Sequence, residues 1–474
     1  MSSETFLLMR HELLLTAAAL FVLMAEIFTD PRKNRNGISL FSIIVYAAVT
    51  LAGFIPSGEG SLFGGMYVTD GTRLLMKNIL NTGVLIVLIQ SVQWLKKEEN
   101  AGLLSEYIIL VISTVIGMNF MISAGHFIMF YIGLELATIP ITALAAFERY
   151  RNKSAEAGIK LIFSSALSSG ILLYGLSMIY GTTGSLYFSE VASFFRGENL
   201  QILGFIFFFA GMAFKISLVP FHLWAADVYE GAPVNITSYL SVVSKGAAVF
   251  ILIIVLYTVF PVIIEVWQKT IYVIAVMTMT IGNLFAIRQQ NLKRFLAFSS
   301  ISQAGYILLG FIGGSELGMA TVIYYILVYV FSNLGAFGVV TAISNATGKE
   351  NMDDYNGLYK TNPGLSLTMT LSLFSLAGIP PVAGFFGKFF LFTAAAQKGF
   401  YILVLIAVLN TIISLYYYLL VVKAMFMNKS EAPIVKFRSD FSTKLALGIC
   451  IAGLVVTGFA SAIFEMIRNL SFGV

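Results

Sequence analysis

Four charged residues lie inside long apolar runs of this chain, where a charge is costly: Glu135, Lys215, Lys245 and Lys388. An isolated charge at the centre of a bilayer costs about 2.5–3.5 kcal/mol on insertion scales, so such residues mark functional sites by default. Burial disfavours the charged form of a carboxylate or an ammonium group, whereas an opposite charge nearby favours it. The chemistry open to these side chains is therefore uptake and release of protons, as in a proton relay.

Glu135 and Lys215 could act as a pair. Opposite charges ~5 Å apart attract by about 3 kcal/mol at an effective dielectric constant near 20. That attraction is comparable with the cost of burying one charge, so pairing offsets desolvation only in part. Moving a partner charge by a few ångströms could then change the protonation of either group.

Prolines interrupt two of the apolar runs beside these lysines. Pro220 follows Lys215 by five residues and removes a backbone hydrogen-bond donor from the helix. The paired Pro380 and Pro381 precede Lys388 in the second run. Irregular backbone at membrane depth persists only where protein or water covers it. The sequence therefore predicts two broken helices, each with a lysine next to the break.

Other polar residues in the apolar runs allow two interpretations. His222, just after the first break, could relay protons or cap a helix. Lys160 lies about two turns from a basic loop, so it could serve the relay or snorkel to the interface. Ser299, Ser302 and Gln303 give one run a polar face, which could line a water path or join helices by hydrogen bonds.

Composition places the chain among polytopic membrane proteins. Hydrophobic residues make up 58% and charged residues 11%, and the mean hydropathy is +0.87, whereas about 25% of residues are charged in an ordinary soluble domain. The first run is expected to remain as a span, because no small-residue cleavage site follows it. We predict an all-α protein with about 14 transmembrane helices, near residues 11–28, 38–56, 73–95, 102–121, 125–147, 155–180, 201–219, 234–257, 268–287, 294–313, 317–343, 366–396, 400–424 and 442–466.

Basic residues in the loops and near the ends of the spans alternate between the two sides of the membrane. Loops on one side carry 18 of them, against 7 on the side that holds both termini, a group that includes Lys77. Because lysine and arginine accumulate in cytoplasmic loops, we predict both termini on the non-cytoplasmic side. Asp227 and Glu230, just before Pro233, are expected in a solvated turn at the membrane surface.

Several kinds of chemistry are disfavoured within the chain. The only cysteine, Cys450, excludes an internal disulfide and a protein-ligated iron–sulfur cluster. The three histidines, His11, His126 and His222, do not have metal-ligand spacing, so no metal site is expected. No basic cluster is interleaved with stacking aromatic residues, so no nucleic-acid partner is expected.

The two breaks occupy corresponding places in two blocks of five spans, which indicates two inverted five-helix repeats, each with a proline-broken helix. We predict a single transmembrane domain over residues 1–474, in which 1–100 hold three N-terminal helices and 101–257 hold the first repeat. The second repeat is expected over 258–428, and a C-terminal helix over 429–474.

Four motifs occur together and in order along the chain. They are the helix around Glu135, the segment FKISLVPFHLWAADVYEGAP at 214–233, the segment FSSISQAGY at 298–306, and the segment GIPPVAGFFGK at 378–388. With these motifs the chain resembles, from end to end, the antiporter-like proton-pumping subunits of bacterial NADH–quinone oxidoreductase (respiratory complex I), and among them the subunit N family. The related sodium/proton antiporter subunits share the core motifs and are the alternative. A lysine at 388 is similar to the N type, whereas M-type paralogues usually carry glutamate there.

The resemblance implies a coupling pair of Glu135 and Lys215, a central relay at Lys245, and terminal proton exchange at Lys388. It implies a non-redox translocase subunit, driven by electron transfer from NADH to quinone elsewhere in the electron transport chain. NADH, FMN, iron–sulfur clusters and quinone would then be bound by partner subunits, and no cofactor by this chain. The expected partners are antiporter-like paralogues and small membrane subunits, within the bilayer of the bacterial inner membrane.

Overall fold

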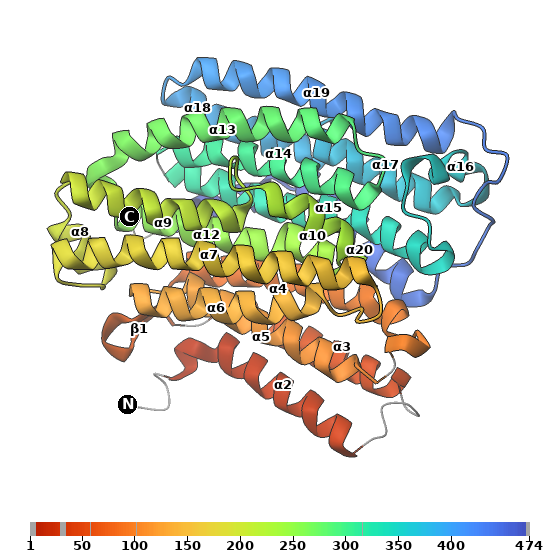
Figure 1. Cartoon of the computed structure of the whole chain (residues 1–474), viewed down its shortest axis with the longest axis horizontal. Coiled ribbons are helices and arrows are strands. Elements are labelled where there is room, and N and C mark those ends of the chain that lie inside the picture. The colour runs from red at the N-terminus through yellow and green to blue at the C-terminus, as the bar shows by residue number, and fades with distance from the viewer. Residues whose placement is uncertain (1–5, 29–34, 57, 101, 315, 471–474) are drawn as a thin grey trace. The chain divides into compact units, whose positions relative to one another are not determined.

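The computed structural model describes residues 6–28, 35–56, 58–100, 102–314 and 316–470 (Figure 1). Helices form nearly all of it, and a small antiparallel hairpin pairs β1 (Gly60–Leu62) with β2 (Tyr67–Thr69). The α-helices are α2 (Arg10–Phe28), α3 (Arg35–Gly53), α4 (Gly71–Leu95), α5 (Leu104–Ile122), α6 (Phe127–Ala145), α7 (Asn152–Thr183), α8 (Phe188–Phe194), α9 (Asn199–Ile216), α10 (Leu223–Gly231), α11 (Val234–Tyr239), α12 (Lys245–Thr258), α13 (Ile264–Ile287), α14 (Leu292–Ile312), α15 (Glu316–Thr347), α16 (Leu358–Thr361), α17 (Pro363–Ala377), α18 (Ala383–Gln397), α19 (Tyr401–Phe426), α20 (Phe441–Phe459) and α21 (Ser461–Asn469). Short 3₁₀ turns lie at Leu7–Met9, Phe63–Gly65, Glu98–Asn100, Pro261–Ile263 and Met352–Tyr355, and a π-helical turn lies at Leu240–Ser244.

The membrane class predicted from composition is confirmed. Within the described ranges, 13 helices are long and apolar enough to cross a membrane, and α17 is a shorter apolar helix. Across the break at 378–382, α17 is followed by α18, so together they occupy the place of the predicted span at 366–396. The chain is therefore an all-α polytopic membrane protein.

The helices fall into two compact units. Of the described residues, the first contains those within 6–215 and 244–266 together with residue 470, and therefore holds α2 to α9 together with α12. The second contains 216–243 and 267–469, with α10, α11 and α13 to α21. The chain passes between the units at the first predicted helix break, directly after Lys215.

In the first unit, α5 and α6 run side by side (Figure 1). Their backbones approach closely, because a Cβ atom at Gly117 would lie 2.4 Å from the backbone nitrogen of Ala137. On the facing helix, a Cβ atom at Gly133 would lie 2.6 Å from the nitrogen of Met121. Only glycine permits this approach. The contact fixes the position of α6, the helix that carries Glu135.

The first break lies between α9 and α10. The backbone leaves the helix at Ser217, which has a φ of +64°, and the Val219–Pro220 peptide bond is cis. Val219 N donates a hydrogen bond to Thr278 Oγ1 of α13 at 3.1 Å, so protein groups cover part of this irregular backbone. Pro140, by contrast, lies inside α6 without ending that helix.

In the second unit, α15 packs against α14, α17, α18 and α20. The second break turns at Gly378, with a φ of +84°, and the Pro380–Pro381 peptide bond is cis. The two half-helices approach so closely that a Cβ atom at Gly384 would lie 1.8 Å from the carbonyl oxygen of Ser375. The Ser375 hydroxyl accepts a hydrogen bond from Gly384 N at 3.1 Å, so it satisfies a donor at the start of α18.

Candidate functional site

Lys215 lies at the last turn of α9 and reaches toward α6. Its Nζ donates a hydrogen bond to Thr138 Oγ1 at 2.5 Å, and that hydroxyl donates in turn to the carbonyl of Leu134 at 2.6 Å. Thr138 follows Glu135 by about one turn of the same helix. The Glu135 carboxylate contributes a favourable Coulomb interaction to the ammonium group. Lys215 therefore contacts the helix that carries Glu135 through Thr138, and the ion pair between Glu135 and Lys215 stays a prediction.

Glu135 retains one oxygen that no other group satisfies. Its Oε1 is buried, and no described residue donates a hydrogen bond to it. An unsatisfied buried acceptor is costly, and in native proteins it commonly marks a functional group or the position of a water molecule. This carboxylate can therefore accept a proton or a hydrogen bond from a group that approaches it.

A small cavity adjoins Lys215 within the first unit. It has a volume of only about 10 Å³ and is lined by Leu134, Thr138, Ser165, Ser168, Ser169, Leu172, Gly211, Phe214 and Lys215. Serines of α7 supply hydroxyl groups on one side, and Ser168 Oγ donates to the carbonyl of Gly211 at 3.2 Å. On this measure a cavity needs about 10–15 Å³ to hold one water molecule, together with two to four polar partners. The space is therefore just large enough for a single water molecule beside the ammonium group.

Lys245 begins α12 and is 2% exposed. The π-helical turn Leu240–Ser244 precedes it directly, and such turns are frequent at functional sites because they redirect the side chains that follow. Within the first unit, α12 packs against α4, α5 and α8. The sequence did not predict this turn.

Lys388 lies in α18 beside the second break and is 3% exposed. Its Nζ donates to the carbonyl oxygen of Ala377, the last residue of α17, at 3.2 Å. It also lies 4.4 Å from the centre of the Tyr306 ring. A carbonyl freed by the break and an aromatic face both stabilise an ammonium group. The break thus creates the environment of the lysine that the sequence placed next to it.

The polar face of α14 takes part in a hydrogen-bonded network in the second unit. Gln303 Nε2 donates to the carbonyl of Leu376 at 2.9 Å and to the Tyr418 hydroxyl at 3.1 Å. Tyr325 donates to Gln303 Oε1 at 2.5 Å. Ser299 Oγ lies 2.5 Å from the Tyr418 hydroxyl. Gln303 therefore joins α14 to the end of α17, next to the break that holds Lys388.

Three further predicted residues occupy different surroundings. Ser302 Oγ is buried without a hydrogen-bond partner among the described residues. His222 is buried in the first break, and its Nδ1 likewise has no partner there. Lys160 lies on the exposed surface of α7, where its Nζ pairs with Glu156 at 2.7 Å, one turn earlier.

Two acidic residues predicted in a solvated turn lie instead in a helix. Asp227 and Glu230 belong to α10, and Arg294 Nη1 of α14 pairs with them at 2.7 and 3.1 Å. The prediction of a turn was wrong because the helix that starts after the first break continues to Gly231, almost up to Pro233. These ion pairs tie α10 to the first turn of α14.

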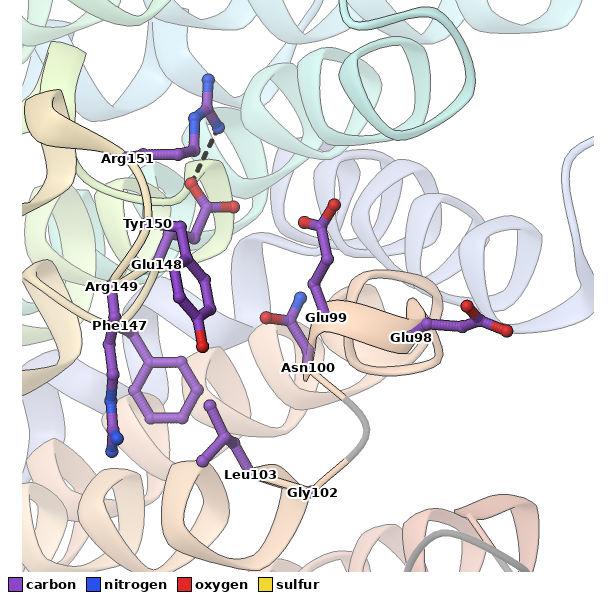
Figure 2. Close-up of a pocket in the computed structure, with 10 residues that line it drawn as sticks. All are labelled: Glu98, Glu99, Asn100, Gly102, Leu103, Phe147, Glu148, Arg149, Tyr150 and Arg151. Carbon is purple, nitrogen blue, oxygen red and sulfur yellow. Dashed lines mark hydrogen bonds and ion pairs between the residues drawn. The ribbon is translucent and has the colours of Figure 1, made fainter.

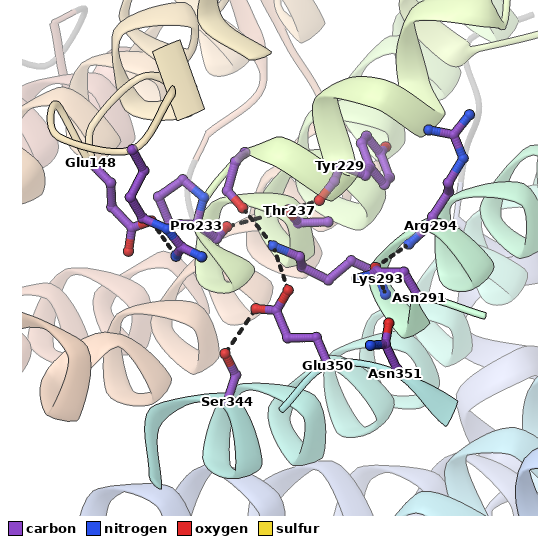
Figure 3. A network of polar contacts seen from close by, with 12 residues as sticks. Glu148, Tyr229, Pro233, Thr237, Asn291, Lys293, Arg294, Ser344, Glu350 and Asn351 are labelled. Carbon is purple, nitrogen blue, oxygen red and sulfur yellow. Dashed lines mark hydrogen bonds and ion pairs between the residues drawn. The ribbon is translucent and has the colours of Figure 1, made fainter. Parts of the chain in front are cut away.

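Lys293 is one of the 18 basic residues that the sequence assigns to loops on one side, but it lies in α14 and its side chain is buried (Figure 3). Its Nζ pairs with Glu350 Oε2 at 3.1 Å and donates to the carbonyl of Ala232 at 3.2 Å. Ser344 Oγ donates to the other Glu350 oxygen at 2.9 Å. This network joins α14, the end of α10 and the segment after α15 within the second unit.

A buried ion pair in the first unit was missed by sequence reasoning. Lys77 Nζ of α4 lies 2.7 Å from Glu12 Oε1 of α2, and these side chains are 0% and 2% exposed. The Tyr67 hydroxyl accepts from Lys77 at 2.9 Å and donates to Glu12 Oε2 at 3.0 Å. Counting Lys77 as a loop residue was therefore wrong, since it lies well inside α4, which begins at Gly71.

A surface pocket of about 490 Å³ is lined by none of the predicted relay residues (Figure 2). It is lined by Glu98, Glu99, Asn100, Gly102, Leu103, Phe147, Glu148, Arg149, Tyr150 and Arg151. Glu148 accepts from Trp94 Nε1 at 2.9 Å and pairs with Arg151 at 2.7 Å. Among the described residues, no group of three or more histidine, cysteine or acidic side chains could hold a metal ion.

Comparison with known proteins identifies the family. Residues 124–414 match the model of the NADH:quinone oxidoreductase/Mrp antiporter membrane family. The chain is 51% identical over 470 residues to NADH-quinone oxidoreductase subunit N of Phocaeicola vulgatus, covering 99% of each chain. It is 41% identical over 464 residues to the subunit of the same name from Desulforamulus reducens, covering 97% of this chain and 96% of the relative.

Solved structures agree in fold. A chain of respiratory complex I from Thermus thermophilus superposes with a TM-score of 0.80 at 25% identity, covering 96% of this chain and 98% of that one. A chain of the Mrp complex from Dietzia sp. superposes with a TM-score of 0.86 at 21% identity, covering 99% and 97%. The second likeness shows a common fold only. The chain therefore belongs to the NADH-quinone oxidoreductase subunit N family, a group of antiporter-like membrane subunits of respiratory complex I.

Proposed function

We propose that this membrane subunit of complex I translocates protons across the bilayer, coupled to electron transfer from NADH to quinone in partner subunits. The observation that carries the proposal is Lys215, whose ammonium group is held by Thr138 one turn from Glu135 and beside a serine-lined cavity. The relay runs through Glu135, Lys215, Lys245 and Lys388, in the order of the chain. His222 and Lys160 are additional candidates.

The surroundings of Lys215 support two protonation states of its side chain. At Thr138 the lysine donates to a hydroxyl and feels the Glu135 charge at longer range. Protonation of Glu135 removes that stabilising charge, because a neutral carboxyl no longer favours the ammonium form. Lys215 then releases its proton into the cavity lined by serines of α7. Recharging of Glu135 restores the first state.

Lys388 has the surroundings of a group that exchanges a proton with the outside. The Ala377 carbonyl and the Tyr306 ring stabilise its charged form without an opposing full charge in these contacts. Such an ammonium group is held more weakly than one in an ion pair, so it can lose its proton when a like charge arrives nearby. The polar face of α14, with Ser299, Ser302 and Gln303, lines the approach to it.

Proton pumping by the reconstituted complex tests the proposal. Glu135→Gln and Lys388→Met should each lower the initial rate of NADH-driven proton uptake into proteoliposomes at least fivefold, because each removes a titrating group. Lys269→Met is the matched control, since Lys269 is exposed and outside the predicted relay. Wild-type pumping in both relay variants, at normal levels of assembled complex, would refute the relay.

A sodium/proton antiporter subunit is the second candidate, favoured by the family model that also covers Mrp antiporters and by the likeness to the Dietzia fold. It predicts that the chain supports sodium-dependent proton movement without NADH. Proton uptake that requires NADH and is unchanged by sodium would exclude it. We further propose that both termini lie on the non-cytoplasmic side of the bacterial inner membrane, with paralogous antiporter-like subunits and small membrane subunits as neighbours.

A further inference from the structure

A basic groove in the second unit is separate from the relay. It has a volume of about 680 Å³ and lies between the start of α17, the start of α20 and the segment before α20. Residues of the segments 361–368, 436–439 and 444–451 line it. We propose that this groove binds the headgroup of an anionic phospholipid, with an acyl chain laid between α17 and α20.

The charge of the groove matches an anion. Lys436, Arg438 and Lys444 line it, and no carboxylate does. All three are exposed, and none forms an ion pair with a described residue. The nearest acidic side chain in sequence, Asp440, caps α20 by accepting a hydrogen bond from Thr443 N at 3.4 Å. Three unpaired cations held around one groove repel each other, so an anion between them is stabilising.

The groove is held in place by a buried side chain. Asn362, the residue before α17, is 6% exposed. Its Nδ2 donates to the carbonyl of Val435 at 3.4 Å, and its Oδ1 accepts from Phe437 N at 3.3 Å. These bonds fix the segment that carries Lys436 and Arg438 against the start of α17. The positive end of the α17 dipole thus faces the same groove.

An apolar slot continues from the charged mouth. Leu365, Leu447 and Ile451 form its walls, and two glycines keep it open. A Cβ atom at Gly364 or Gly448 would meet no atom within 4 Å. A free phosphate or a nucleotide has no apolar chain to fill such a slot, whereas a phospholipid has both an anionic headgroup and long acyl chains.

The position of the groove agrees with a lipid ligand. It lies where α17 and α20 begin, at loops that belong to the side carrying most basic residues of the chain. Basic pockets between transmembrane helices at the cytoplasmic surface are typical of headgroup binding by anionic lipids. The inference does not depend on the proton relay, because none of the relay residues lines the groove.

Lipid retention by the purified complex tests the inference. The delipidated complex, in detergent, is titrated with dioleoylphosphatidylglycerol or with dioleoylphosphatidylethanolamine, and bound lipid is counted by native mass spectrometry. Wild type should bind one phosphatidylglycerol much more tightly than phosphatidylethanolamine. Removing each base should weaken binding about fivefold, so Lys436→Gln/Arg438→Gln/Lys444→Gln should weaken it on the order of a hundredfold.

Matched variants separate the groove from charge in general and from a free anion. Lys360→Gln/Lys423→Gln/Lys429→Gln removes the same charge from exposed positions outside the groove and should retain the lipid. Gly448→Leu should block the slot and release the lipid with all three bases in place, whereas Gly448→Ala should bind as wild type. Both glycine variants should unfold at the wild-type temperature, because the position faces open space.

Several outcomes would overturn the inference. Equal binding of the two lipids by wild type, or equal losses in the groove and control triple variants, would show that no specific headgroup site exists. Competition by millimolar inorganic phosphate together with full binding by Gly448→Leu would indicate a free-anion site. Cross-links from Lys444 to a carboxylate of a partner subunit, with no lipid retained in the wild-type complex, would show that protein covers the groove.

Discussion

Breaking the buried ion pair between α2 and α4 should destabilise the first unit strongly. Lys77→Met removes the ammonium group that lies 2.7 Å from Glu12, and it leaves the carboxylate 2% exposed. Among the residues that the structure describes, only the Tyr67 hydroxyl then continues to donate to Glu12, at 3.0 Å. A buried charge that has lost its partner is the costly product of this substitution.

The magnitude follows from the distance and the burial. Two unit charges separated by 2.7 Å attract by about 6 kcal/mol at an effective dielectric constant near 20. Desolvation of both groups offsets most of this, so the net value of the pair is small, but removing one partner of a buried pair costs about 3–5 kcal/mol. Glu12→Gln/Lys77→Met, which removes both charges, should recover most of the loss.

Thermal unfolding of the full chain in detergent, followed by tryptophan fluorescence, measures the effect. The control is Lys160→Met, which breaks an exposed pair and should cost less than about 1 kcal/mol. If Lys77→Met and Lys160→Met lower the unfolding temperature equally, the reasoning from burial is refuted. If the double variant is as unstable as Lys77→Met alone, the cost does not arise from an unpaired charge.

Three further predictions test individual contacts. Thr138→Val removes the hydroxyl that accepts from Lys215 and should slow proton pumping several-fold, whereas Thr142→Val, one turn later on α6, should not. Gly384→Ala places a Cβ atom against the carbonyl oxygen of Ser375 and should lower the free energy of unfolding by about 3 kcal/mol or more. Gly364→Ala should be neutral, because Gly364 is likewise the second residue of its helix, α17, but faces open space. Burial lowers the pKa of His126 from its ordinary value of 6.5, and its neutral Nδ1 accepts from Ile128 N at 3.0 Å at the start of α6. The stability that the neutral His126 side chain contributes is therefore complete above about pH 6.5 and is lost as the pH falls through the lowered pKa. His126→Asn should remove this pH dependence from the unfolding temperature.

The sequence could predict features whose residue types differ sharply from those of their neighbours in the chain. A charge within a long apolar run needs no neighbour to be noticed, so Glu135, Lys215, Lys245 and Lys388 could be named from hydropathy alone. Both broken helices followed from prolines, because proline removes a backbone donor whatever the tertiary structure. Pro140 shows the limit of that rule, since α6 continues through it.

The missed features depend on contacts between distant segments. Glu12 and Lys77 each lie near one end of an apolar run, where a charge is usually solvated, and only the packing of α2 and α4 buries them. Hydropathy carries no signal for that packing. The same holds for Arg294, whose acidic partners precede it by more than sixty residues. The π-helical turn before Lys245 adds no distinctive residue, so propensity could not predict it.

The number of protons pumped per electron pair by the Lys215→Met complex tests the central claim most directly. The measurement compares proton uptake with NADH oxidation in the same proteoliposomes, beside Lys269→Met as the control. A relay through Lys215 predicts that the substitution lowers the ratio, or that it stops NADH oxidation together with pumping if the two are tightly coupled. A fully assembled variant that oxidises NADH at the wild-type rate with the wild-type ratio would contradict the account.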